Sequence, residues 1–160
     1  MAYQFRPMSA HDLPMVRQWL LVPEVAEWWG DPDEQFGLVR GDMHEPAMDQ
    51  YIVSLEGTPF GYLQCYRLTD WNICFGPQPE GTRGIDQMIG VPELIGRGHG
   101  SGFIRVFTED LLKSGTPRVV VDPAPDNPRA IRAYEKAGFV RDKLVDTPEG
   151  ISLLMVRTHD

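Results

Sequence analysis

The chain is poor in cysteine and has no apolar run of the roughly 20 residues needed to cross a membrane. Its two cysteines, Cys65 and Cys74, lie among apolar residues and show neither Cys-x-x-Cys nor histidine spacing. This pattern favours buried free thiols over a disulfide or a metal site. The first residues lack the apolar segment of a secretory signal, and no repeat occurs. At 160 residues, we therefore expect one domain over residues 1–160, cytoplasmic and without a metal.

Positive charge is also scarce, because 15 Lys and Arg face 23 Asp and Glu, for a formal net charge of -8. A surface of this sign repels nucleic acid and acidic membranes at long range, so neither is expected as a partner. It would attract a cationic small molecule. The same acidity could instead only keep the protein in solution, and charge alone does not separate these two interpretations.

Hydrophobic periodicity predicts strands and helices that alternate along the chain. The order predicts an α/β fold with a mixed sheet and helices on both sides. Residues 31–49 and 69–83 have no clear pattern, although 71–75 could be a strand and 76–82 is typical of a loop. Strands are expected at 3–7, 51–55, 60–68, 84–89, 119–121, 139–145 and 151–157, and helices after Ser9, around 36–40, at 103–112 and at 129–137.

A glycine-rich turn, with glycines at 96, 98, 100 and 102, joins the strand at 84–89 to the helix at 103–112. Glycine permits positive φ, so consecutive backbone N–H groups can converge on an anion at the helix N-terminus. A P-loop is excluded because the turn lacks Gly-Lys-Ser/Thr. A dinucleotide fingerprint would need a third glycine where Ser101 or Phe103 stands. The turn is either a cradle for another diphosphate or only a tight connection.

Two segments together resemble the GNAT superfamily of N-acetyltransferases. With Gly98 and Gly100 in its glycine positions, the turn resembles the pattern Arg/Gln-x-x-Gly-x-Gly/Ala, although Ile95 departs from it at the first position. Residues 126–139 resemble a second signature, Asn-x-x-Ala-x-x-x-Tyr-x-Lys-x-Gly-Phe. Two signatures at the family's separation are much more specific than either one alone. The resemblance implies a single GNAT-like domain with a mostly antiparallel, twisted sheet and a strand split at the coenzyme site.

Within that superfamily, residues 27–30, 83–87 and 122–127 are similar to those of the aminoglycoside 6′-N-acetyltransferases. The similarity is weakest at 31–49 and 68–82, where those enzymes place part of the wall that faces the sugar. The resemblance implies transfer of an acetyl group from acetyl-CoA to a primary amine of a cationic small molecule. The 6′-amine of an aminoglycoside antibiotic is the expected acceptor, which implies antibiotic resistance. We expect a monomer or a homodimer.

The resemblance also implies two catalytic residues. Asp86 would anchor the substrate ammonium and accept its proton, directly or through water. A carboxylate in an apolar strand is costly to bury, so Asp86 must meet a partner or a cleft. Tyr134 would protonate the departing thiolate of coenzyme A. As a lone aromatic residue on an amphipathic helix it would otherwise be a core residue.

The resemblance also implies residues that bind each of the two substrates. For acetyl-CoA, backbone groups would hold the pantetheine arm like an added strand, a glycine-turn segment would hold the diphosphate, and Asn127 would contact pantetheine. For the amine, Asp122 would bind a second ammonium or else cap a turn, and tryptophans would form walls or only pack. Because Trp28 and Trp29 are neighbours on a helix, either one of them faces a cleft or both bridge core layers. The full sets are Gln87, Met88, Ile89, Arg97, Gly98, His99, Gly100, Ser101 and Asn127 for acetyl-CoA, and Trp28, Trp29, Trp71, Asp86 and Asp122 for the amine.

Two alternatives stay open at the level of function. The enzyme could acetylate another amine, such as a siderophore precursor, a polyamine or a protein N-terminus. The chain could instead be a non-catalytic acyl-CoA sensor, in which Asp86 and Tyr134 would be dispensable. The paired carboxylates Asp86 and Asp122 and the acidic balance favour a polycation over a peptide amine.

Overall fold

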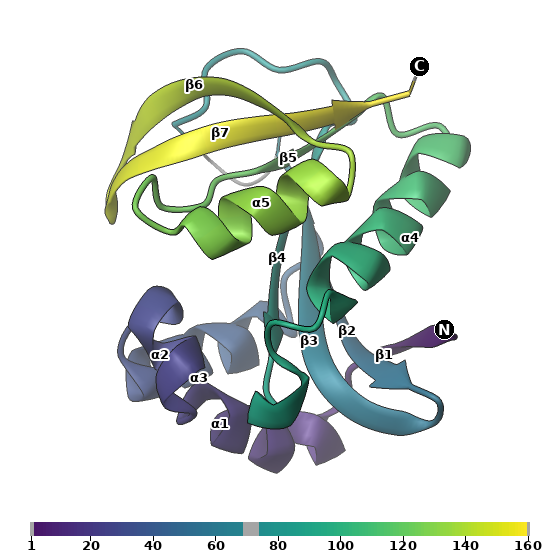
Figure 1. Cartoon of the computed structure of the whole chain (residues 1–160), viewed down its shortest axis with the longest axis vertical. Coiled ribbons are helices and arrows are strands. Elements are labelled where there is room, and N and C mark those ends of the chain that lie inside the picture. The colour runs from purple at the N-terminus through teal and green to yellow at the C-terminus, as the bar shows by residue number, and fades with distance from the viewer. Residues whose placement is uncertain (1, 69–73, 160) are drawn as a thin grey trace. The chain divides into compact units, whose positions relative to one another are not determined.

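The structure is a computed structural model that describes residues 2–68 and 74–159 (Figure 1). Its contacts group the chain into two compact units. The first unit contains Met1–Cys65 and Asp86–Arg97, and the second unit contains Tyr66–Ile85 and Gly98–Asp160.

The first unit combines a run of helices with an antiparallel strand pair. Its strand order is β1-β2-β3-β4, and β1 pairs with β2 from Tyr3↔Leu55 to Pro7↔Tyr51. Figure 1 shows its three labelled helices gathered together. A tight turn at Glu56 and Gly57, both with positive φ, joins β2 to β3. The elements are β1 (Tyr3–Pro7), α1 (Leu13–Leu20), α2 (Pro23–Trp29), α3 (Pro32–Asp42), β2 (Met48–Leu55) and β3 (Thr58–Arg67), with 3-10 turns at Ala10–Asp12 and Pro92–Leu94.

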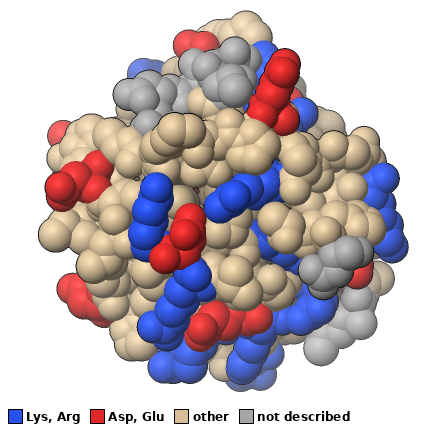
Figure 2. Space-filling model, turned by 90° about the horizontal axis from the view of Figure 1, so that it is seen from above, with Lys and Arg blue, Asp and Glu red and all other residues tan. Residues whose placement is uncertain are grey.

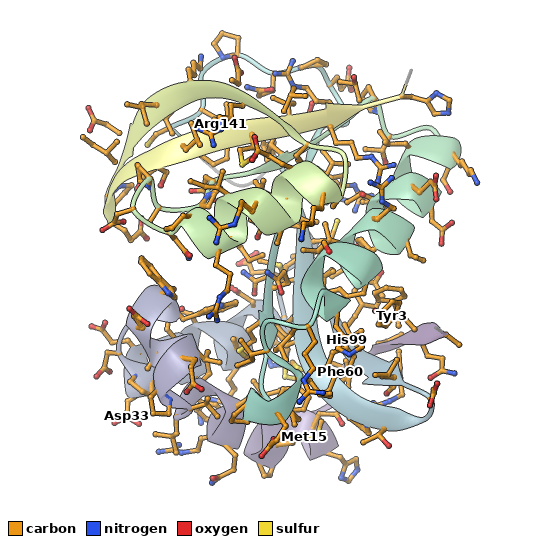
Figure 3. All side chains as sticks on the ribbon, in the orientation of Figure 1. Tyr3, Met15, Asp33, Phe60, His99 and Arg141 are labelled. Carbon is orange, nitrogen blue, oxygen red and sulfur yellow. The ribbon has the colours of Figure 1, made fainter. Side chains whose placement is uncertain are left out.

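The core of the first unit lies between these helices and strands. A Cβ on Gly90 would lie 1.9 Å from Cγ of Trp19, so the chain after β4 can pass this ring only as glycine. On the strands, the rings of Tyr3 and Phe60 stack with centroids 6.3 Å apart (Figure 3). The buried cluster consists of Val16, Trp19, Leu20, Val25, Val39, Ile52, Tyr62 and Met88.

The second unit has the strand order β4-β5-β7-β6. β5 runs parallel to β4 at Arg83↔Val119 and Gly84↔Val120, where the register ends, and it pairs with β7 in the antiparallel sense. The guanidinium of Arg157 on β7 donates to Thr108 Oγ1 at 2.6 Å and so fixes β7 to α4. The elements are β4 (Arg83–Ile89), α4 (His99–Lys113), β5 (Arg118–Val121), α5 (Pro128–Lys136), β6 (Val140–Thr147) and β7 (Gly150–Thr158).

The predicted fold class, a mixed and mostly antiparallel sheet with helices, is confirmed. The helix expected around 36–40 is longer and begins at Pro32, because Asp31 caps it by accepting from the backbone N–H of Glu34 at 3.0 Å. Residues 71–73 of the possible strand at 71–75 lie outside the described residues, and Phe75 is not in a strand. Cys65 is buried as predicted, but the prediction was wrong for Cys74, which lies in a turn and is exposed.

Charged side chains of both signs are interspersed on the face shown in Figure 2, so the acidic excess is not concentrated there. Within residues 2–68 and 74–159, no helix is both long enough and apolar enough to cross a bilayer. The expectations of one domain and of a cytoplasmic location stay predictions.

Candidate active site

The side chain of Asp86 is the end point of a hydrogen-bonded row in the first unit. Its Oδ2 accepts from Gln64 Nε2 at 2.9 Å, and Gln64 Oε1 accepts from the hydroxyl of Tyr62 at 2.7 Å. The same hydroxyl accepts from Gln50 Nε2 at 3.0 Å, and Gln50 Nε2 also donates to the carbonyl of Val39 at 2.8 Å. The half-buried Asp86 therefore has the partner that its place in an apolar strand requires.

A second carboxylate, Asp42, belongs to the same electrostatic environment. Burial, together with the charges of Glu45 and Asp86, raises the pKa of Asp42 from its ordinary 3.8 to about 6. Burial also raises the pKa of Tyr62, and the nearby Asp42 and Asp86 charges act in the same direction, so this phenol stays neutral. The first unit thus holds a concentration of negative potential that a cation would relieve.

The sequence does not predict Asp42 as a site residue, because residues 31–49 show no clear hydrophobic periodicity. One signal was present. Asp42 is the last residue of α3, where the negative end of the helix dipole disfavours a carboxylate. An acidic residue in that position is a reason to look for a cationic partner.

The predicted tryptophans differ in their surroundings. Trp29 donates from Nε1 to the carbonyl of Gln87 at 3.3 Å, and its ring meets Tyr62 edge-on with centroids 6.1 Å apart. Trp28 is 42% exposed on α2, so the two neighbours do not both bridge core layers. Trp71 lies outside the described residues. Trp29 therefore braces the strand next to Asp86, and Trp28 has the exposure that a ligand wall needs.

The predicted acetyl-CoA segment of β4 also lies in the first unit. Met88 is buried in the core, whereas Gln87 and Ile89 are half-buried. The backbone N–H of Gly90 donates to the carbonyl of Phe60 at 2.8 Å, which fixes the end of this segment beside β3. The three residues thus form a short stretch of extended backbone held by the core on one side.

The glycine turn leads into α4, which belongs to the second unit. Gly98 caps this helix with a φ of 84° and without a side-chain hydrogen bond to the first turn. The N–H groups of the first turn, including those of His99, Gly100 and Ser101, have no acceptor within the helix. A Cβ added at Gly98 would meet nothing within 4 Å. An open, left-handed glycine before N–H groups at the positive helix end fits a diphosphate.

The other predicted residues of the second unit lie on or near α5. Tyr134 is buried and its ring meets Phe139 edge-on, with centroids 5.6 Å apart. Asn127 Oδ1 caps α5 by accepting from the N–H of Ala130 at 3.2 Å, and its Nδ2 is the group that could donate to a ligand. Asp122 is half-buried directly after β5.

The structure brings Asp86, Trp29 and Gln87 together around Tyr62 in the first unit. Tyr134, Asp122 and Asn127 belong to the second unit. Among residues 2–68 and 74–159, no group of three or more His, Cys, Asp or Glu side chains is arranged to hold a metal ion.

Comparison with known proteins defines the class. Residues 9–147 match the family described as an acetyltransferase (GNAT) domain, and the chain therefore belongs to this family. It is an acetyl-CoA-dependent N-acetyltransferase, as the two sequence signatures predicted.

Among curated proteins, the chain is 36% identical over 169 residues to the aminoglycoside N(6′)-acetyltransferase type 1 of Klebsiella pneumoniae, covering 96% of this chain and 82% of that relative. It is also 43% identical over 80 residues to a kanamycin resistance protein of Rhizobium radiobacter, covering 49% of this chain and 74% of that relative. Among solved structures, AAC(6′)-Ib with paromomycin and acetyl-CoA has a TM-score of 0.90 at 33% identity, covering 99% of this chain and 94% of the other. The predicted family, fold and acetyl donor are confirmed.

Proposed function

We propose that this enzyme acetylates the 6′-amine of an aminoglycoside and thereby inactivates the antibiotic. Support comes from the Klebsiella pneumoniae relative, whose similarity extends over 96% of this chain. The observation that carries the proposal is the placement of Asp86 on the hydrogen-bonded row, with Asp42 nearby at a raised pKa. A polyamine sugar supplies several positive charges to such a region, whereas a peptide N-terminus supplies one.

Asp86 serves as the anchor and base in this proposal. Ammonium groups are protonated at neutral pH, and only the neutral amine attacks a carbonyl carbon. Gln64 donates to one carboxylate oxygen of Asp86, and an ionised Asp86 can bind an ammonium group and accept its proton. The proton passes to Asp86 directly or through water.

Acetyl-CoA supplies a thioester whose acyl carbon the amine attacks. The N–H groups of His99, Gly100 and Ser101 would hold the diphosphate, and the neighbouring Arg97 would add a positive charge. Backbone groups of Gln87, Met88 and Ile89 would hold the pantetheine arm, and one N–H would polarise the thioester carbonyl. The side-chain Nδ2 of Asn127 would donate to the pantetheine.

Tyr134 is the proposed acid, because its hydroxyl can give a proton to the sulfur as the thioester breaks. Asp122 and Asp42 would bind further ammonium groups of the sugar, and the exposed ring of Trp28 would cover one of its faces. Trp29 acts by bracing Gln87. We also predict that Trp71 contacts the amine substrate, that the enzyme is a monomer or a homodimer, and that it is cytoplasmic.

The direct test is a thiol-release assay with acetyl-CoA and four amines: kanamycin, tobramycin, spermidine and a lysine peptide. The proposal predicts turnover with the two aminoglycosides and little with the others. Preference for spermidine or the peptide would redirect the enzyme to another amine. Binding of acetyl-CoA without release of thiol from any of them would instead favour an acyl-CoA sensor. An Asp86→Asn variant that retained full turnover would remove Asp86 from the mechanism.

A further inference from the structure

The row of hydrogen bonds that ends at Asp86 has only one consistent direction. It begins at the carbonyl of Val39, which can only accept, so the Gln50 atom facing it must be the donor Nε2. The Tyr62 hydroxyl accepts from that same Nε2 and must give its own proton to Gln64 Oε1. The remaining amide nitrogen of Gln64 then faces Asp86. Reversing either amide would place two acceptors against each other.

The members of this row come from neighbouring elements of the first unit. Val39 belongs to α3 and Gln50 to β2, while Tyr62 and Gln64 are two residues apart on β3 and so point to the same face. Asp86 follows on β4, the next strand in the order β2-β3-β4. The row therefore crosses three adjacent strands and is fixed at its far end to the main chain of a helix.

Tyr62 is the most deeply buried polar side chain of the row. Its side chain is fully buried, and it belongs to the core cluster that also contains Val39. Burial raises the pKa of its hydroxyl, so the proton that it donates to Gln64 is present throughout the working pH range. Gln64, by contrast, is only half-buried and could rotate its amide if Tyr62 did not hold Oε1.

We propose that Tyr62 and Gln50 are positioning residues that set the orientation of the Asp86 carboxylate through the amide of Gln64. This inference rests on the proposed role of Asp86 as the base. Neither Tyr62 nor Gln50 needs to touch a substrate. They keep the donor end of Gln64 towards Asp86, so that the carboxylate is held in one orientation before the amine arrives.

The first variant is Tyr62→Phe, which removes one oxygen and keeps the ring that fills the core. The expected result is a fall of about 10-fold in kcat for the aminoglycoside, the effect of weakening one hydrogen bond to a charged group. The dissociation constant of acetyl-CoA, measured by calorimetry, should not change. Tyr3→Phe is the matched control, because it is the same chemical change on β1 and leaves the row intact. It should behave as wild type.

A double-mutant cycle separates positioning from general damage. In an Asp86→Asn background, Tyr62→Phe should cost little further activity, because the group that it orients has lost its function. A further loss of about 10-fold in that background would show that Tyr62 acts elsewhere and would overturn the proposal. Gln50→Met is the second variant, and its loss should be smaller, because Tyr62 can still donate to Gln64.

A readout without substrate keeps this inference separate from the proposed function. The side-chain amide protons of Gln64, followed by NMR, should exchange with water faster in Tyr62→Phe than in wild type or Tyr3→Phe. Unchanged exchange together with unchanged kcat would refute the positioning role. If wild type acetylates no aminoglycoside but the exchange rate still rises in Tyr62→Phe, the proposed function fails while the row holds the amide as described.

Discussion

Replacing Asp42 by Asn should make the protein more stable at neutral pH and a poorer catalyst. The two side chains have nearly the same shape, so the change removes a charge with little effect on packing. In the native protein, burial and the neighbouring Glu45 and Asp86 raise the pKa of Asp42 from 3.8 to about 6. Folding therefore disfavours the ionised form of this side chain.

The size of the effect follows from that shift. The full difference between 3.8 and about 6 corresponds to about 3 kcal/mol at ~1.36 kcal/mol per pKa unit. Asp42 is only half-buried, so solvent screening reduces this to about 1 kcal/mol. In a chain of this length, such a gain for Asp42→Asn raises Tm by about 2–4 °C.

The pH dependence has a definite sign. The pKa of Asp42 is higher in the folded than in the unfolded protein, so the folded state binds more protons between about pH 4 and about pH 6. Wild type therefore gains stability from this group as the pH falls through that window. The advantage of Asp42→Asn should be complete at about pH 8, fall to about half at about pH 5, and vanish below about pH 4.

The assay is thermal unfolding of wild type and Asp42→Asn at about pH 8 and about pH 5, with the KM for kanamycin measured at the higher pH. Asp126→Asn, an exposed residue of a turn in the second unit, is the matched control for removing one carboxylate. Asp42→Asn should raise KM, because one anchor for a cation is lost. The electrostatic reasoning would be refuted if Asp42→Asn were no more stable than wild type at about pH 8. It would also be refuted if the gain in stability over wild type were the same at about pH 8 and about pH 5.

Three further predictions concern the donor site and the chemistry. Gly98→Ala should raise the KM for acetyl-CoA by about 10-fold. Gly115→Ala is the control, because Gly115 also has a positive φ and open space around an added Cβ. It should strain the backbone in the same way without changing this KM. Equal KM values in both would argue against a diphosphate at Gly98. Asp86→Asn should lower kcat by about 100-fold or more in the thiol-release assay, and near-normal turnover would exclude it as the base. Tyr134→Phe should lower kcat by a similar factor, about 100-fold, with acetyl-CoA affinity kept, and weaker binding with normal kcat would contradict its role as the acid.

Much of the fold could be predicted because local patterns and local packing agree. The strand at Tyr3–Pro7 has the predicted bounds, and Gly138 follows α5 at a φ of 105° as a glycine after a helix should. The start of α3 was missed for a local reason as well. An Asp-Pro pair also suits a turn, whereas Asp31 and Pro32 are here the cap and the first residue of α3.

The site was less predictable, because its contacts join residues far apart in the sequence. Asp86 could be singled out from its motif and from the cost of a carboxylate in an apolar strand. The partners that hold it, Gln64, Tyr62 and Gln50, carry no motif, and the register across the strands decides whether they meet. Asp42 depends on the same long-range packing.

The most direct test compares neomycin with paromomycin, two aminoglycosides that differ at the 6′ position by an amine against a hydroxyl. The proposed function predicts release of coenzyme A with neomycin, a single acetyl group on its 6′-nitrogen by NMR, and no comparable release with paromomycin. Equal turnover of both, or acetylation of neomycin at another nitrogen, would contradict it.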